Sequence, residues 1–469
     1  MKIVFLNLPN KKQVIRRYMC SYNAPNFLFP PLELMYLASA TREWNQAQVW
    51  IIDAIAKKWR IKQVEQELHK IAPDLVVFLS GFEIFQEDMQ AVAELQSKLA
   101  SAKFAVFGYL PTLFAEQVLS KTEIDFCLMD EPEITLSELC VALAKPSGLE
   151  GIAGLAWKRA GRVVVNSRRP RIRDLDKLPF PARDLLDNDL YGEPMLSRPF
   201  TLIQSARGCP FSCTYCVRSF GAEFVSRSAE NIIAEIEQCL TAHGIKNFRF
   251  IDDTFNATKD RSRQISQLIL DQGWSVKWTA LSRADTLDLE TLKLMRRAGC
   301  RRLYIGIESG SQKILDLYRK GYQIDKIKQA VQMVHNSGME SVGFFMVGAP
   351  GENEQDLKMS IALAKQLNFD FIAVFKAVSY PGTPLFDQHQ EQIEFSLFPY
   401  LNRLKDRALE QRYAAWEKRF YREYYFRPGY VARSLIRLFK NPVQSVKGLI
   451  QVSKYLLTPT KQESRQDLI

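Results

Sequence analysis

The sequence predicts two successive α/β units followed by a basic, helical C-terminal region. Two series of short apolar, strand-like runs alternate with helix-like segments, and three clustered cysteines stand at the start of the second series. Alternating strands and helices are typical of parallel sheets. The chain has 469 residues, of which 47% are hydrophobic and 25% charged. That length and composition suffice for about three globular domains.

The first series predicts a doubly wound parallel sheet. Strands are expected at 2–8, 49–52, 75–79, 104–107 and 124–128, with helices at 31–44, 62–71, 88–100, 113–119 and 135–144. Such sheets bind ligands at the carboxyl ends of their strands. The candidate residues there are Asn7, Ser80, Gly81, Gly108, Thr112 and Glu131. A hairpin over 154–166 follows, and the arginine-rich run 168–173 is interpreted as a solvated face.

The second series contains six strand–helix steps. Its strands are expected at 201–205, 248–251, 277–281, 302–307, 341–347 and 371–378. The polar and glycine residues at their carboxyl ends are Asp252, Asp253, Arg283, Glu308 and Gly348. A carboxylate or arginine taken alone is as often a helix cap or a salt bridge as a ligand contact. Their repetition at strand ends, beside the cysteines, indicates a binding site.

Cys209, Cys213 and Cys216 lie within eight residues, directly after the first strand of this series. The short gaps place them on a tight loop, where their sulfurs can converge on one centre. Three thiolates suit soft metals. A zinc site normally needs a fourth Cys or His, and the nearby Cys239 and His243 fall within an expected helix. A four-iron–four-sulfur cluster with one open iron is therefore favoured over zinc.

This spacing, with Tyr215 in the aromatic position before the last cysteine, resembles the cluster motif of the radical S-adenosylmethionine (radical SAM) superfamily. The six steps are similar to the partial (β/α)6 barrel of that superfamily. The resemblance implies that the open iron binds S-adenosylmethionine near Tyr215 and that the reduced cluster cleaves it to a 5′-deoxyadenosyl radical. It also implies contacts from Asp252 or Asp253 to the methionine amino group, Arg283 to the carboxylate, Glu308 to the ribose and Gly348 to the adenine.

The preceding sheet resembles the cobalamin-binding domain of cobalamin-dependent radical SAM enzymes. Segments 108–112, 130–133 and 174–183 match patterns common in that class. The resemblance implies cobalamin, as methylcobalamin, near the strand-end residues of the first series. The only histidine before residue 200 is His69, within an expected helix, so no histidine is expected on the cobalt. The alternative is a vestigial or purely interactive α/β domain.

Four segments are therefore expected: a cobalamin-binding-like domain (1–150), a hairpin and linker (151–199), a radical SAM partial barrel (200–388) and a basic, helical C-terminal region (389–469). The resemblance implies a C-methyltransferase, of the class B type and related to the anaerobic Mg-protoporphyrin ester cyclase, that acts on a small-molecule or lipid-like substrate. It also implies a reductant such as flavodoxin or ferredoxin. A non-methylating cyclase, oxidase or rearrangement enzyme and a non-catalytic sensor or electron carrier remain alternatives. No catalytic side chain is assigned.

The net charge of +11 is concentrated in residues 401–469, which hold 15 Lys and Arg against 6 Asp and Glu. Apolar and basic residues recur there at helical spacing: Val431, Leu435 and Leu438 beside Arg433, Arg437 and Lys440, and again over 446–454. Basic amphipathic helices lie on anionic membranes, but they also pack against protein. We expect a cytoplasmic enzyme, with peripheral membrane contact and packing on the barrel as the two alternatives for this region. The nearly neutral body argues against nucleic acid.

Overall fold

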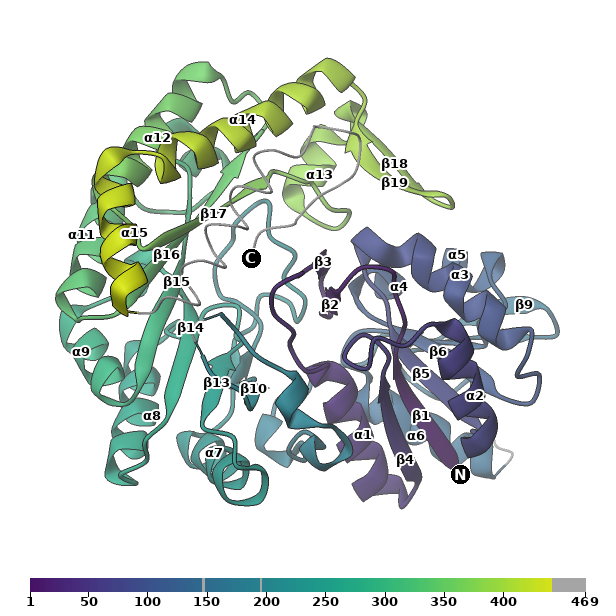
Figure 1. Cartoon of the computed structure of the whole chain (residues 1–469). Helices are drawn as coiled ribbons and strands as arrows, with labels where there is room; N and C mark the ends of the chain where they lie inside the picture. Colours follow the sequence, from purple (N-terminus) through teal and green to yellow (C-terminus); the bar gives the residue numbers. More distant parts are fainter. Residues whose placement is uncertain (146–147, 195, 441–469) are drawn as a thin grey trace.

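The computed structural model describes residues 1–145, 148–194 and 196–440, the last six of these as backbone only. Its N-terminal part is a sheet in the order β4-β1-β5-β6-β7-β8-β9, beside a second, six-stranded sheet (Figure 1). The first five strands are parallel: β1 (Lys2–Asn7), β4 (Gln48–Asp53), β5 (Leu75–Leu79), β6 (Lys103–Phe107) and β7 (Phe126–Leu128). The predicted doubly wound sheet is confirmed, and β8 (Leu155–Arg159) with β9 (Arg162–Val165) extends it as an antiparallel hairpin.

Helices cover both faces of this sheet because its central strands are apolar on both sides. One face packs against α1 (Leu32–Asn45) and α6 (Pro132–Ala144), the other against α2 (Ile61–Ile71), α3 (Phe85–Gln96) and α5 (Ala115–Lys121). The short α4 (Tyr109–Leu113) follows β6 directly. The sequence did not predict the small hairpin of β2 (Val14–Arg16) and β3 (Ser21–Asn23) that connects β1 to α1.

The second sheet is the predicted partial barrel of six parallel strands, in sequence order. The strands are β10 (Phe200–Ile203), β13 (Asn247–Phe250), β14 (Lys277–Arg283), β15 (Cys300–Glu308), β16 (Glu340–Val347) and β17 (Phe371–Lys376). Its outer helices are α7 (Ala229–His243), α8 (Lys259–Asp271), α9 (Leu289–Arg297), α10 (Gln312–Leu317), α11 (Ile324–Asn336) and α12 (Glu354–Leu367). A continuous apolar core joins these helices to the outward side chains of the strands.

As far as residue 440, the C-terminal region is helical as predicted, except for a hairpin at its start. After α13 (Pro384–His389), β18 (Ile393–Leu397) and β19 (Tyr400–Leu404) pair antiparallel, and α14 (Arg407–Tyr425) and α15 (Pro428–Lys440) follow. The hairpin reaches toward α3 and α5, whereas α14 crosses the barrel (Figure 1). Phe398 and Phe395 contact Phe85 and Phe114 at ring distances of 5.5 Å each. The hairpin therefore joins the two sheets.

Tyrosines of α14 cover the free edge of β17. The hydroxyl of Tyr421 accepts from Val374 N (2.8 Å) and that of Tyr425 accepts from Ile372 N (3.0 Å), and each also donates to the carbonyl of the same residue. An uncovered edge strand would expose unpaired backbone groups. The dense aromatics of this segment therefore complete the barrel. Among the described residues, no helix is long and apolar enough to cross a membrane.

Candidate active site

The three cysteines lie on one loop at the carboxyl end of β10. The antiparallel pair β11 (Ala206–Arg207) and β12 (Val225–Ser226) closes the base of this loop. Gly208, with a φ of +81°, precedes the first cysteine, and a Cβ there would lie 2.1 Å from the carbonyl oxygen of Glu223. Only glycine allows this approach. The glycine before the first cysteine is thus a requirement of the loop backbone.

The thiols are close enough to influence one another electrostatically. Burial raises the pKa of Cys216 well above its ordinary value, and the neighbouring Asp253, Cys213 and Cys209 raise it further. Burial likewise raises the pKa of Cys209. Arg283 Nη1 donates to the Sγ of Cys213 over 3.1 Å. Buried thiols that resist ionisation, as Cys209 and Cys216 do, are suited to a cationic iron–sulfur cluster, because the metal supplies the missing positive charge.

The described residues contain no group of three metal-ligating side chains already arranged around one point. The donor set still fits a four-iron cluster better than zinc, since His243 and Cys239 belong to α7 and Cys239 is fully buried in the barrel core.

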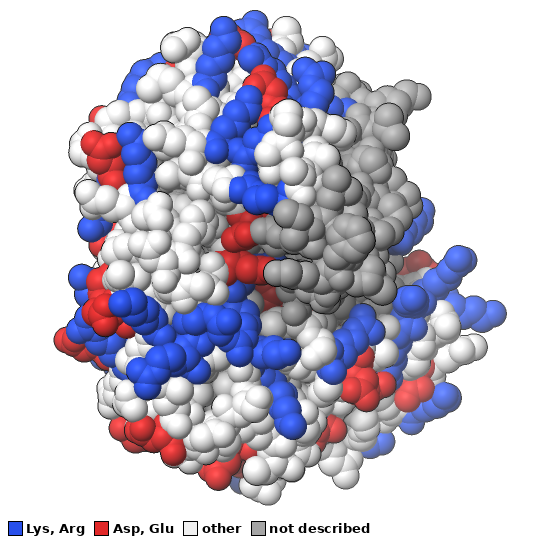
Figure 2. Space-filling model, turned by 60° about the vertical axis from the view of Figure 1, so that its left-hand side comes forward, with Lys and Arg blue, Asp and Glu red and all other residues white. Residues whose placement is uncertain are grey.

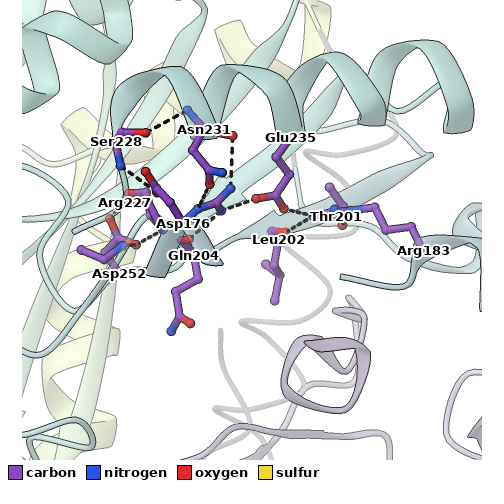
Figure 3. A network of polar contacts seen from close by, with 12 residues as sticks. Asp176, Arg183, Thr201, Leu202, Gln204, Arg227, Ser228, Asn231, Glu235 and Asp252 are labelled. Atoms are coloured by element: carbon purple, nitrogen blue, oxygen red, sulfur yellow. Dashed lines mark hydrogen bonds and ion pairs between the residues drawn. The ribbon is translucent and has the colours of Figure 1, made fainter. Parts of the chain in front are cut away.

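A buried ionic network supports the base of the loop (Figure 3). Glu235 of α7 accepts from Arg183 (2.5 Å) and pairs with Arg227, and all three side chains are buried. Arg227 also donates to the carbonyl of Gln204 (3.1 Å), and Arg183 donates to that of Leu202 (2.9 Å). The network thereby holds the strand that leads into the cysteines. It places the linker residue Arg183 in a structural role.

Tyr215 belongs to a polar cluster that crosses the barrel mouth. Its hydroxyl donates to Glu308 Oε1 over 2.8 Å, and Lys320 Nζ lies 3.0 Å from the same oxygen. Glu308 ends β15 with a φ of +66°, and its side chain is 8% exposed. Sequence reasoning predicted Tyr215 and Glu308 but missed Lys320, which follows a short helix and carries no motif. The carboxylate of Glu308 is therefore held in place by two donors, Tyr215 and Lys320, and is not a solvated charge.

Arg283 lies at the carboxyl end of β14, as predicted, and it already has hydrogen-bond partners there. Its guanidinium forms two hydrogen bonds to Asp285 (3.0 and 3.2 Å), one to the carbonyl of Lys320 (2.6 Å) and one to Cys213. It also lies 3.8 Å from the ring centre of Phe211. A guanidinium with these partners has little capacity left for a bidentate carboxylate contact. In this structure Arg283 anchors the cysteine loop.

The adjacent aspartates after β13 have distinct environments. Asp252 accepts from the backbone N–H groups of Ser205 (2.6 Å) and Ala206 (3.0 Å), so it fixes the end of β10. Asp253 instead has a buried Oδ2 without a hydrogen-bond partner. Burial, with a contribution from Asp252, raises the pKa of Asp253 to about 6. Of the two, Asp253 is the carboxylate with capacity for a ligand.

Gly348 lies at the carboxyl end of β16 with a φ of +92°. Its N–H donates to Glu352 Oε2 over 2.6 Å, and a Cβ would lie 2.5 Å from the ring of Tyr413 in α14. Oε1 of Glu352 is buried without a partner. The strand end therefore combines a glycine backbone, an acid with one unpaired oxygen and contact with the C-terminal region. Glu352 was not predicted as a site residue.

The candidates in the N-terminal sheet are largely bonded to the β2–β3 hairpin. Arg16, buried with Asp88 in a 2.7 Å ion pair, donates to Asn7 Oδ1 (2.8 Å), and Ser80 donates to Asp88 (2.9 Å). The hydroxyl of Tyr18 lies 3.1 Å from that of Thr112. Gly108 packs under the carbonyl of Ser80, and Gly81 packs against Ser21. Glu131 pairs with Arg207 of the cysteine loop.

The arginine-rich run was only partly solvent-exposed, contrary to the prediction. The side chains of Arg168 and Arg173 are 51% and 75% exposed. Arg169 is 13% exposed and donates to Thr135 (2.9 Å), whereas Arg171 approaches Glu131 (3.8 Å). Two of the four arginines thus fasten the linker to the N-terminal sheet.

The carboxyl ends of both sheets face the cysteine loop. Tyr109 lies at the start of α4, near Cys216. Burial raises the pKa of Tyr109, and the nearby Cys216 raises it further. A three-cysteine loop at the mouth of an open barrel, facing the ligand edge of a doubly wound sheet, defines a two-domain radical SAM fold. A model of the radical SAM superfamily matches residues 203–364. The chain belongs to this superfamily.

The similarity extends well beyond that match. An uncharacterized methyltransferase of Pyrococcus horikoshii is 33% identical over 388 residues, which cover 82% of each chain. Cytidylyl-2-hydroxyethylphosphonate methyltransferase of Streptomyces wedmorensis is 24% identical over 76% of this chain and 77% of its own. The anaerobic magnesium-protoporphyrin IX monomethyl ester cyclase of Cereibacter sphaeroides is 24% identical over 78% of this chain and 61% of its own.

Two solved structures share the fold over most of the chain. The cobalamin-dependent S-adenosylmethionine radical enzyme OxsB aligns with a TM-score of 0.75 and 17% identity, covering 97% of this chain and 71% of that one. The radical S-adenosylmethionine methyltransferase TsrM of Kitasatospora setae aligns with a TM-score of 0.66 and 17% identity, covering 83% and 75%. The predicted order of doubly wound sheet, barrel and C-terminal region is that of these proteins.

Proposed function

We propose that this protein is a cobalamin-dependent radical SAM C-methyltransferase. The observation that carries the proposal is the cysteine loop, whose three thiols lie between the mouth of the barrel and the strand ends of the N-terminal sheet. When bound, the cluster and S-adenosylmethionine supply a 5′-deoxyadenosyl radical, and cobalamin supplies a transferable methyl group. The chain's own residues position these groups and exclude water.

The barrel residues offer a binding site for S-adenosylmethionine in two parts. Asp253 has an unpaired buried oxygen beside the cysteine loop, which suits the methionine amino group. Glu308, fixed by Tyr215 and Lys320, suits the ribose hydroxyls, and the strand end at Gly348 is the proposed contact for the adenine. Arg283 is committed to Cys213 and Asp285, so in this proposal it positions the loop instead of binding the methionine carboxylate.

A cobalamin at the N-terminal sheet would contact the β2–β3 hairpin more than the strand ends beneath it. Asn7, Ser80, Thr112 and Glu131 are already hydrogen-bonded within the chain. The hairpin instead offers the hydroxyl of Ser21, which is buried without a partner. In the proposal the predicted strand-end residues therefore support the hairpin that touches the cofactor.

The inward side of β16 favours an apolar substrate. Phe345 and Val347 of β16 face the helices, so by strand alternation Phe344 and Met346 face inward. These two are half-buried, and the ring of Phe344 lies 5.6 Å from Tyr304 and 5.7 Å from Phe375. A small-molecule or lipid-like substrate with a flat or aliphatic portion would fit this side of β16. The proposed reductant of the cluster is a separate electron donor such as flavodoxin or ferredoxin.

The C-terminal region supports a further proposal, peripheral contact with an anionic membrane. Phe426 and Val431 are 60% and 43% exposed at the junction of α14 and α15, close to Arg433. Leu435, Leu438, Arg437 and Lys440, and the second predicted stretch at 446–454, lie outside the residues whose side chains are described.

The test of the enzymatic function is anaerobic purification with iron and cobalamin analysis, followed by incubation of cell extract with methyl-labelled S-adenosylmethionine. We expect about four irons per chain, bound cobalamin, 5′-deoxyadenosine and a labelled product. 5′-Deoxyadenosine with an unlabelled product would favour the cyclase or oxidase alternative. Absence of 5′-deoxyadenosine from cluster-loaded protein would overturn the enzymatic function and favour a sensor or electron carrier.

A further inference from the structure

Arg207 connects the cysteine loop to the N-terminal sheet. It ends β11, two residues before Cys209. Its Nη1 donates to Glu131 Oε1 (3.1 Å) and its Nη2 to Glu133 Oε1 (2.6 Å), both from the start of α6. Its Nε donates to Gln204 (3.0 Å). The arginine side chain is 4% exposed and each glutamate 5%, so the two ion pairs are shielded from water and salt.

Aromatic rings enclose this arginine. Its guanidinium lies 5.0 Å from the ring centre of Phe220 in the cysteine loop and 5.8 Å from that of Tyr36 in α1. Phe220 also stacks on Tyr18 at 5.1 Å. A cavity of about 10 Å³ beside them has room for one water, which fits the unpaired oxygens of Glu33 and Glu133 at this site.

Glu131 binds a third segment of the chain. Its Oε2 accepts from the backbone N–H of Ile172 over 2.7 Å, and the guanidinium of Arg171 approaches within 3.8 Å. One carboxylate thus joins the start of α6, the linker and the cysteine loop. Glu131 directly follows Asp130 at the carboxyl end of β7, where the sheet turns toward the barrel.

We propose that Arg207, Glu131 and Glu133 form a buried charged joint that fixes the separation between the cysteine loop and the N-terminal sheet. Buried ion pairs add little net stability, but their geometry is demanding and removal of one partner is costly. The joint therefore specifies a position more than it strengthens the fold. It rests on the proposed function, in which cofactors lie on both sides of it, and makes Arg207 a positioning residue.

The direct measurement is the magnetic interaction between the reduced cluster and cob(II)alamin in the holoenzyme. This interaction falls steeply with the distance between the two centres, so it reports a small displacement. A displacement of ~1 Å also matters for the reaction, because it can lower the rate by about 100-fold. Arg207→Gln should weaken the interaction and broaden its distribution. Hydrogen exchange should at the same time increase in residues 206–226 and at the start of α6. Arg302→Gln is the matched control, because Arg302 is equally buried and pairs with Glu340 (2.7 Å) within the barrel.

Arg207→Gln leaves two carboxylates buried without a cation, so lower stability alone would not be informative. The triple variant Arg207→Gln, Glu131→Gln, Glu133→Gln removes all three charges and should recover most of the stability. We expect the magnetic interaction in the triple variant to be as weak as in Arg207→Gln. In Arg207→Lys, which keeps the positive charge, the interaction should be stronger than in Arg207→Gln but weaker than in the wild type.

The proposal of a joint would be overturned if the triple variant had the same magnetic interaction and the same hydrogen-exchange pattern as the wild type. Wild-type protein that binds the cluster but no cobalamin would overturn the proposed function instead. In that case the exchange at the start of α6 alone decides on the joint: unchanged exchange in Arg207→Gln would refute it.

Discussion

At the scale of single residues, the cysteine loop carries the most specific prediction. Cys213→Ala should abolish formation of 5′-deoxyadenosine, because Cys213 is both a predicted iron ligand and the partner of Arg283. Cobalamin content should stay unchanged, since the N-terminal sheet lies on the other side of the loop. The measurement is anaerobic turnover of S-adenosylmethionine by reconstituted protein.

Cys239→Ala is the control for this experiment. Cys239 is fully buried in α7, where it was the alternative fourth ligand of a zinc site. The variant should keep its iron and its cleavage activity. Retained cleavage in Cys213→Ala, or zinc in place of iron in the wild type, would contradict the cluster assignment.

Glu352 gives a pH-dependent prediction. Burial raises its pKa to about 7, although the N–H groups of Ala349 and Gly348 act against this. Because the pKa in the folded state is higher than in the unfolded chain, the contribution to stability is complete below about pH 4.5 and is lost as the pH rises through about 7. Glu352→Gln keeps the acceptor and removes the charge. We expect it to exceed the wild type by about 1–3 kcal/mol at pH 8 and to match it near pH 5.

The measurement is denaturant unfolding of the two proteins between pH 5 and pH 8. Glu391→Gln, a change at an exposed position, should leave the pH profile of stability as it is in the wild type. Parallel profiles for wild type and Glu352→Gln would show that the buried acid does not titrate in this range.

The sequence predicted which residues lie at the strand ends but not which of them are free. Asp252 and Asp253 are adjacent and chemically identical, yet Asp252 is used to fix Ser205 and Asp253 keeps an unpaired oxygen. Arg283 is predicted as a carboxylate ligand, and the sequence does not show that its guanidinium also bonds to Asp285 and Cys213. Such choices depend on contacts between distant segments, and local sequence patterns do not contain them.

At the scale of elements, strand periodicity was sufficient for both sheets. All eleven predicted parallel strands are present, because buried strands are continuous apolar runs. The β2–β3 hairpin and the β18–β19 hairpin were missed. Each has short strands of mixed polarity, and both are stabilised by packing between the two sheets more than by their own sequence.

The tyrosine cover of β17 leads to an element-scale prediction. Tyr421→Phe combined with Tyr425→Phe keeps the rings but removes both hydroxyls, leaving the N–H groups of Val374 and Ile372 without those partners. Each unpaired buried group costs about 1–3 kcal/mol, so the double variant should lose about 2–6 kcal/mol of unfolding free energy. Denaturant unfolding measures this loss directly.

Tyr413→Phe is the matched control, since Tyr413 lies in α14 like the two exchanged tyrosines but its ring packs on Gly348. It should cost clearly less than the double variant. Exposure of the β17 edge should also increase self-association, which light scattering would detect. Equal stability of the double variant and the wild type would mean that the hydroxyls contribute nothing to the edge.

At the scale of the whole molecule, charge is distributed unevenly along the chain. On the face shown in Figure 2, both basic and acidic side chains are present among the described residues. The excess of +9 belongs to residues 401–469. Part of that region is now explained without a membrane, because Arg419 pairs with Glu423 and Glu354, and Arg427 donates to Asn368. The unexplained part begins near α15.

The last prediction tests that part directly. Each Lys or Arg near an anionic bilayer adds roughly 1 kcal/mol of attraction, which salt screens, and the exposed side chains of Phe426 and Val431 would add an apolar contribution. Binding to phosphatidylserine-containing vesicles, measured by sedimentation, should fall with salt and with Arg433→Glu plus Arg437→Glu. The same charge change on α2, Lys62→Glu plus Lys70→Glu, should have little effect. If the wild type ignores these vesicles at low salt, the C-terminal charges serve the protein itself, and the lipid-like substrate loses this support.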